Sequence, residues 1–243
     1  MSRSDHATSL EKLTREGTEG TPPVLAATVI LLRDGSAGLE TLMLKRNSKI
    51  AFGGMWVFPG GRIDPDDWEG IEEHDDLSAS RRAAEREALE ECGLAVEPAS
   101  MHPFSHWTPP ATTPRRFLTW FFAARAGTGE VEIDYGEIHE SDWMTPADAL
   151  RRRDAQEIEV APPTFVSLSE LCAFRDVEEA LSSIRARAPE RFQTRIGLAD
   201  TGPVCMWHGD AGYESTDPNA SGPRHRLTMQ KAATWTYTRS PTT

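Results

Sequence analysis

The sequence is poor in cysteine and in basic residues, and it lacks a long apolar run. Its three cysteines, Cys92, Cys172 and Cys205, are far apart and show no paired ligand spacing, so we expect free thiols in a reducing cytosol. The 26 Lys and Arg are outnumbered by 38 Asp and Glu, which gives a formal charge of −12. Nucleic acid and anionic membranes bind basic surfaces, so we expect neither as a partner. No apolar segment approaches the roughly 18 residues that a membrane-spanning helix requires.

A zinc pattern and a peroxisomal address are also missing. The seven histidines are scattered, without a His-Glu-x-x-His spacing. The ending Ser240-Pro241-Thr242-Thr243 carries no Ser-Lys-Leu signal. We therefore expect a cytoplasmic protein without a zinc site.

A chain of 243 residues accommodates one large domain or two small ones. We predict a mobile polar arm over 1–22, a main domain over 23–190, and a C-terminal extension over 191–243 that packs on the same domain. Alternating apolar residues and turn residues predict strands at 24–33, 39–46, 56–58, 117–124 and 140–144, with hairpin strands after 191. Helical spacing predicts helices at 81–92, from 146, and twice between 162 and 188. These elements indicate a mixed α and β fold.

The most informative segment is the acidic block Arg86-Glu87-Ala88-Leu89-Glu90-Glu91-Cys92-Gly93-Leu94. In a helix, Glu87, Glu90 and Glu91 share one face within one turn. Three like charges there repel one another, whereas a hard divalent cation needs several clustered carboxylate oxygens. The block therefore predicts a cation site.

The flanking residues support a helix under this block. Ser78 has the side chain of an N-cap, and Gly93 suits the left-handed position that ends a helix. Ala84, Ala88 and Cys92 form a stripe of small residues at helical spacing, which allows close packing on a sheet. We expect the acidic face to point toward a cleft.

A second motif precedes the block. Trp56-Val57-Phe58-Pro59-Gly60-Gly61 reads as a short strand that enters a tight loop, whose backbone can approach a ligand closely. Pro-Gly-Gly followed by Arg-Glu-x-x-Glu-Glu-x-Gly resembles the signature of the Nudix hydrolases. The resemblance implies an α/β/α sandwich with a mixed sheet, to which this chain would add C-terminal helices and hairpin strands.

The resemblance also implies a chemistry. Nudix hydrolases are pyrophosphohydrolases that use Mg²⁺ or Mn²⁺ to cleave the diphosphate linkage of nucleoside diphosphate derivatives. By this analogy Glu87, Glu90 and Glu91 are metal ligands and catalytic residues, Arg86 positions a glutamate, and a backbone carbonyl of Gly60 or Gly61 is a further ligand. The catalytic base of the family often comes from a loop, so Glu137 and Glu140 are secondary candidates.

The chain departs from the signature in its spacing. Between Gly61 and Arg86 lie 24 residues, about 11 more than in the family pattern. Excising 65–75 as the insertion places Ser78 where the pattern has its first glutamate. That glutamate is then absent, or its place is taken by another acidic residue, for which the candidates are Glu72, Glu73, Asp75 and Asp76.

A further segment resembles one branch of the family. Trp107-Thr108-Pro109, Arg115-Arg116-Phe117 and Phe121-Phe122 look like a segment of the coenzyme A diphosphatase-like Nudix proteins, which also carry an insertion in the signature. The stretch from Arg46 to Gly61 partly matches their coenzyme A motif but lacks its second arginine. We expect Arg46, Arg115 and Arg116 to contact phosphates and Trp107 to stack on adenine, against the alternatives of a solvated strand edge and a core ring.

The leading hypothesis is thus a metal-dependent hydrolase of coenzyme A or acyl-CoA. One alternative is a pyrophosphatase of the ADP-ribose or NADH type, and another is a non-catalytic nucleotide-binding module, which the missing signature glutamate suggests. The expected partner is a small nucleoside diphosphate substrate, with a homodimer as a second expectation because Nudix proteins often dimerise.

Overall fold

The computed structural model describes residues 22–47, 53–111, 113, 116–230 and 234–241, together with Glu11. The predicted N-terminal arm therefore lies outside the described residues, except for Glu11 and Pro22. Within the described chain, no helix is long and apolar enough to cross a bilayer.

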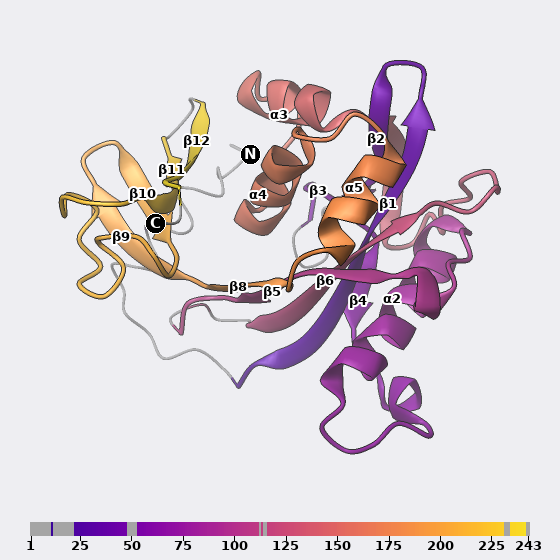
Figure 1. Cartoon of the computed structure of the whole chain (residues 1–243). Helices are drawn as coiled ribbons and strands as arrows, with labels where there is room; N and C mark the ends of the chain where they lie inside the picture. Colours follow the sequence, from indigo (N-terminus) through magenta and orange to yellow (C-terminus); the bar gives the residue numbers. More distant parts are fainter. Residues whose placement is uncertain are drawn as a thin grey trace.

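The centre of the molecule is a mixed sheet (Figure 1). Its strands run in the order β3-β2-β1-β6-β5-β8, with β4 paired to β1 and β7 paired to β2. The β1–β6 and β5–β8 pairs are parallel, and the other pairs are antiparallel. The strands are β1 (Val24–Gly35), β2 (Gly38–Arg46), β3 (Trp56–Val57), β4 (Gly60–Arg62), β5 (His102–Thr108), β6 (Phe117–Arg125), β7 (Ile138–Met144) and β8 (Glu190–Gln193).

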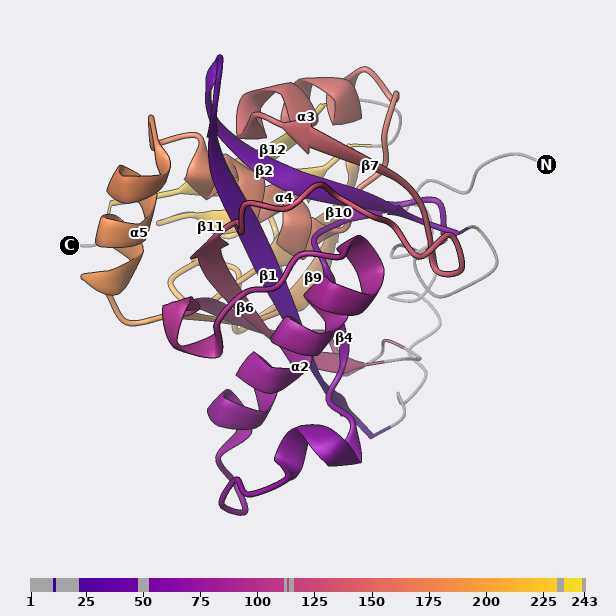
Figure 2. The same ribbon diagram turned by 90° about the vertical axis from the view of Figure 1, so that its right-hand side faces the viewer.

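Helices cover both faces of this sheet. On one face, Val29 and Leu31 of β1 pack with the small residues of α2 (Asp76–Cys92). On the other face, Ile30 and Leu32 join a cluster that includes residues of α3 (Pro146–Asp154), α4 (Pro162–Leu171) and α5 (Val177–Arg185). Figure 2 shows α2 in front of β1, with α4 behind it. The α/β/α sandwich expected from the sequence is confirmed.

The helix that carries the acidic block is one turn longer than predicted. Its N-cap is Asp75, whose carboxylate accepts a hydrogen bond from the backbone N–H of Ser78 at 3.2 Å, so the assignment of Ser78 as the cap was wrong. Gly93 ends the helix at φ 70°, as expected. Ala84, Ala88 and Cys92 are fully buried, and the small stripe lets the helix lie close to the sheet.

Two short 3-10 turns flank this helix. The turn η1 (Pro65–Trp68) follows β4 directly, and Asp64 caps it. The turn η2 (Pro98–Ser100) follows the helix and leads into β5. The segment treated as an insertion thus begins with an ordered turn against α2.

The C-terminal part forms a second, antiparallel sheet in the order β12-β11-β10-β9. Its strands are β9 (Arg195–Ala199), β10 (Gly202–Met206), β11 (His225–Met229) and β12 (Trp235–Arg239), which confirms the predicted hairpins. Trp207, just after β10, packs edge-on against Trp107 of β5 and Phe192 of β8, with ring centroids 5.7 and 5.3 Å apart. The division of the chain into domains stays a prediction.

Candidate active site

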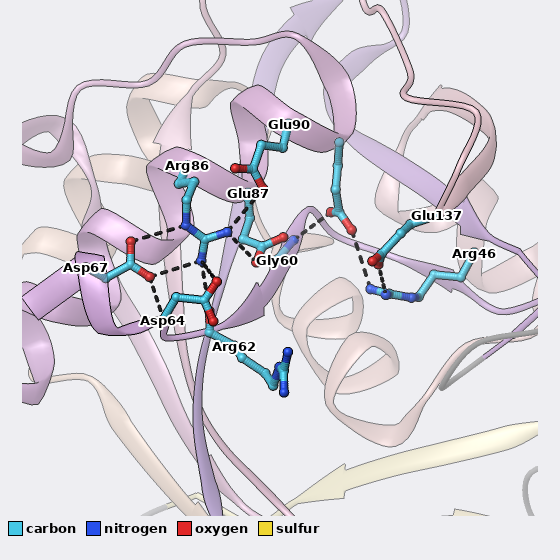
Figure 3. Close-up of polar contacts among 10 residues, drawn as sticks. Arg46, Gly60, Arg62, Asp64, Asp67, Arg86, Glu87, Glu90 and Glu137 are labelled. Atoms are coloured by element: carbon cyan, nitrogen blue, oxygen red, sulfur yellow. Dashed lines mark hydrogen bonds and ion pairs between the residues drawn. The ribbon is translucent and has the colours of Figure 1, made fainter.

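The end of α2 lies against the glycine loop of β4. The backbone N–H of Gly60 donates a hydrogen bond to Oε2 of Glu91 at 2.9 Å. A Cβ atom on Gly61 would overlap the carboxylate of Glu87 in its present position. Glycine therefore lets the loop lie directly against this carboxylate. The two glycines and the last turns of the helix therefore form one site, and Figure 3 shows Gly60 beside the helix.

Arg86 organises one half of this site. Its guanidinium donates to Asp67 through Nε at 3.2 Å and Nη2 at 3.0 Å, and to Glu87 and Glu90 through Nη1 at 2.9 and 3.1 Å. Nη2 also donates to the carbonyl of Arg62 at 3.0 Å. The hydrogen bonds that Arg86 donates to Asp67 raise the pKa of Arg86 above its usual range. A bidentate contact with a carboxylate fixes the plane of the guanidinium, and a lysine cannot make such a contact.

Asp67 is a residue that the sequence analysis missed. It is the sixth residue after Gly61, the interval at which the resembled signature has its first carboxylate, so counting forward without any excision would have found it. It is 5% exposed and bound to Arg86, whereas Ser78 lies in the first turn of α2. The placement of the signature position at Ser78 was therefore wrong, and the extra residues follow Asp67 instead of starting at Pro65.

None of the four acidic residues proposed as substitutes bonds Arg86 in the described structure. Asp75 instead caps α2, and Asp76 is the first residue of that helix. Glu72 and Glu73 lie in the loop between η1 and α2. Asp67 supplies a carboxylate at the signature position. A missing carboxylate is therefore no longer an argument for a non-catalytic module.

A second arginine organises the other half. Arg46, at the end of β2, contacts Oε1 of Glu91 through Nη1 at 3.4 Å and Oε2 of Glu137 through Nη2 at 2.6 Å. Glu137 lies just before β7 in a turn capped by Asp134, whose carboxylate accepts from the N–H groups of Glu137 and Ile138 at 2.8 and 2.9 Å. Figure 3 shows this second cluster beside the first. Glu137 thus belongs to the site.

Burial raises the pKa of both inward carboxyls. Glu91 is 3% exposed, and desolvation raises its pKa to about 8, although the Gly60 N–H and Arg46 both act to lower it. Glu87 is also raised, mainly by burial, despite its contact with Arg86. Burial thus disfavours the ionised form of both neighbouring carboxyls, and such perturbed pKa values are typical of functional sites.

The donor set fits a hard divalent cation. Carboxylate oxygens and loop carbonyls are the ligands that Mg²⁺ and Mn²⁺ prefer. Because Gly61 has no Cβ, its backbone lies close to the carboxylate of Glu87. In the described part of the chain, no three Asp, Glu, His or Cys side chains already gather as a cation site. The two arginines instead pair with the carboxylates (Figure 3).

The remaining residues that the sequence analysis assigned to the site are not part of this cluster in the described structure. Glu140 lies on β7 opposite Lys45 and pairs with it at 2.9 Å, away from Glu91. Arg116 precedes β6, and its Nε is buried without a hydrogen-bond partner in the described structure. Arg115 lies outside the described residues.

Trp107 belongs to the core. Its ring is 4% exposed and stacks on Phe192 with centroids 3.9 Å apart and planes 3° apart, and its indole N–H donates to Ser105 Oγ at 2.9 Å. No face of the ring is left for an adenine. We therefore withdraw Trp107 from the ligand contacts.

Comparisons with known proteins agree with this geometry. The family model of the NUDIX domain matches residues 22–165, more than half of the chain. Acyl-coenzyme A diphosphatase NUDT19 of Xenopus laevis is 30% identical over 132 residues, which cover 51% of this chain and 34% of that protein. The protein of the same name from Gallus gallus is 30% identical over 139 residues, which cover 54% and 36%. The chain thus spans about a third of the length of these relatives.

A solved structure extends the likeness to the fold. The crystal structure of a NUDIX hydrolase from Alicyclobacillus acidocaldarius has 26% sequence identity and a TM-score of 0.61. The match covers 67% of this chain and 96% of the other.

Proposed function

The chain belongs to the NUDIX family, and from that premise we propose that it is a divalent-cation-dependent hydrolase of the diphosphate linkage in nucleoside diphosphate derivatives. We propose coenzyme A or acyl-CoA as its preferred substrate, because the two curated relatives are acyl-coenzyme A diphosphatases. The observation that carries the proposal is the placement of Glu87 and Glu91, both with raised pKa, against the backbone of Gly60 and Gly61.

Glu87, Glu90 and Glu91, with the carbonyl of Gly61, would hold Mg²⁺ or Mn²⁺. The bound ion supplies charge neutralisation for the diphosphate and makes a coordinated water more acidic. The protein contributes rigidity: Arg86 donates to Glu87 and Glu90, and Asp67 fixes Arg86 from the opposite side. The Gly60 N–H orients Glu91.

Arg46 is the phosphate-binding candidate in the other half of the site. Its guanidinium already faces Glu91 and Glu137, so it lies at the site without a ligand present. We propose that it exchanges these carboxylates for diphosphate oxygens when substrate binds, because the guanidinium fork matches phosphate geometry. Arg116 and Arg115 remain proposals for further phosphate contacts.

Glu137 is the preferred candidate for the proton acceptor. Its carboxyl side chain is 59% exposed, so water reaches it, and it lies close enough to Glu87 and Glu91 to raise their pKa values. Glu140 is held by Lys45 and is the weaker candidate. A loop carboxylate next to bound cations is a general base that can accept a proton from water.

The test is a panel of coenzyme A, an acyl-CoA, ADP-ribose and NADH, assayed for phosphate-ester products with Mg²⁺, with Mn²⁺ and with a chelator. We expect cation-dependent hydrolysis with the highest kcat/KM for a coenzyme A substrate. Highest kcat/KM for ADP-ribose or NADH would contradict the substrate assignment. Binding without hydrolysis of any member would contradict the enzymatic proposal and support a binding module.

A further inference from the structure

The turn that presents Glu137 lies over the catalytic end of α2. At its start, the N–H of Glu132 donates to the carbonyl of Cys92, the last residue of that helix, at 3.0 Å. At its end, the N–H of Asn47 donates to the carbonyl of Glu137 at 2.7 Å, next to Arg46. The residues between these two anchors, 133–136, therefore cross the edge of the site.

Two residues stabilise the conformation of the turn. Asp134 accepts hydrogen bonds from the N–H groups of Glu137 and Ile138. A Cβ on Gly136 would lie 2.9 Å from the carboxylate of Asp134 and would push this carboxylate out of its present position. The carbonyl of Gly136 also accepts from the side chain of Asn47 at 3.2 Å. Tyr135 stands between them and performs neither task.

Tyr135 combines two unusual features. Its φ is +56°, a left-handed conformation that glycine or asparagine adopts more readily than an aromatic residue. It is also 79% exposed, the largest exposure among the large hydrophobic residues of the described chain. Among the described residues, the other non-glycine positions with positive φ are His74, Gln156 and Thr216, so in this part of the chain only Tyr135 combines such a backbone with an exposed phenol ring.

A residue held in an unfavourable backbone conformation at the edge of a site is a candidate for a functional role. The aromatic that the sequence offered for base stacking, Trp107, is buried, and Tyr135 is the exposed member of the Phe, Trp and Tyr set in the described structure. Its Cα lies at most about 7 Å from that of Glu137, because only Gly136 lies between them. Tyr135 is thus a near neighbour in the chain of the glutamate that contacts Arg46 at the site.

We propose that Tyr135 is a specificity residue whose ring stacks on the aromatic base of a nucleoside diphosphate substrate. This inference rests on the proposed function for the position of the diphosphate, and it adds that the substrate class is recognised through its base. Stacking on an aromatic side chain tolerates different bases, because every base presents a π face. The site would therefore require a nucleobase but discriminate weakly between purines.

Three variants of the full-length protein test this role. Tyr135→Asn removes the ring but suits the left-handed backbone, Tyr135→Phe keeps the ring, and Leu89→Ala removes an exposed apolar side chain, 54% exposed, from α2. Binding is measured with AMP and with ribose 5-phosphate, which lacks the base. We expect Tyr135→Asn to weaken AMP binding by about tenfold and to leave ribose 5-phosphate unchanged. Tyr135→Phe and Leu89→Ala should match the wild type, and the melting temperature of Tyr135→Asn should not fall.

Turnover separates this inference from the proposed function. With coenzyme A, Tyr135→Asn should raise KM and leave kcat unchanged. Equal AMP binding by the wild type and Tyr135→Asn, or no AMP binding by the wild type, would overturn the stacking role even if hydrolysis is normal. Conversely, Tyr135-dependent AMP binding in a protein that hydrolyses no diphosphate would uphold the stacking role and refute the hydrolase.

Discussion

Two arginines contact the carboxylates of the same helix, but in different ways. Arg86 is itself part of α2, makes a two-pronged contact with the buried Asp67, and also binds a backbone carbonyl (Figure 3). Arg46 comes from a strand, contacts Glu91 at 3.4 Å, and has its shortest contact with a glutamate whose side chain is 59% exposed. The difference indicates a permanent frame around Arg86 and an exchangeable pair around Arg46.

This contrast assigns different tasks to similar ion pairs. Five hydrogen bonds occupy every N–H of the Arg86 guanidinium, so it has no donor to spare for a substrate. A guanidinium held by an exposed loop carboxylate loses little when it turns to another anion, because exposed ion pairs contribute little stability. We therefore expect changes in the Arg86 half to alter the frame and changes in the Arg46 half to alter ligand binding.

The largest effect should follow from Glu91→Gln. We expect turnover to fall by on the order of 10³-fold or more, because a central cation ligand is lost. Stability should not fall. Since burial raises the folded pKa of Glu91 to about 8 from 4.5, its contribution to stability is present below pH 4.5 and lost as pH rises toward 8. Steady-state kinetics and urea unfolding at pH 7.5 measure both, and parallel losses of activity and stability would mark a structural carboxylate instead.

Glu137→Gln and Glu140→Gln compare the two loop-side carboxylates. We expect Glu137→Gln to lower kcat by about 10²-fold, the usual contribution of a general base, with a changed pH profile of kcat. Glu140→Gln removes only a contact with Lys45 and should leave kcat within about twofold. The reverse order would assign the base to Glu140.

Asp67→Asn tests the frame directly. It leaves Arg86 without its two-pronged anion, and we expect about 2–3 kcal/mol of destabilisation together with roughly tenfold lower kcat from misplaced glutamates. Asp67→Glu should recover part of the activity. Ser78→Ala is the matched control, because removing residues 65–75 placed Ser78 at the first glutamate of the signature. An effect of Ser78→Ala equal to that of Asp67→Asn would return the signature position to Ser78.

Arg46→Gln should show the smallest effect on stability and opposite effects on two ligands. Without the competing guanidinium, Mn²⁺ should bind the free protein a fewfold more tightly, whereas KM for coenzyme A should rise by about tenfold. Calorimetric titration of Mn²⁺ and kinetics measure these changes. Weaker Mn²⁺ binding would show that Arg46 belongs to the frame, as Arg86 does.

Much of the fold and half of the site could be predicted from local patterns. The helix over the acidic block, its end at Gly93 and the hairpin of β1 and β2 depend on neighbouring residues. Glu87, Glu90 and Arg86 lie together because the helix places them together. What failed depended on contacts between distant segments.

Three residues show the physical reason for these failures. The motif spacing alone did not fix where the extra residues begin, so Asp67 was counted within the insertion, although η1 brings it to Arg86. Trp107 looked available because β5 was not predicted, and its stacking partner Phe192 lies far along the chain. Glu137 and Glu140 looked equivalent until the pairing of β7 with β2 placed Glu140 opposite Lys45.

We propose that the carboxylates of α2 and the glycine loop together bind a divalent cation. The most direct measurement is anomalous diffraction from crystals of the protein soaked in Mn²⁺. We expect a manganese peak within coordination distance of Glu87 and Glu91, beside the backbone of Gly61, with Arg86 still bound to Asp67. Full occupancy of Mn²⁺ elsewhere, or no peak while both arginines keep these carboxylates, would contradict it.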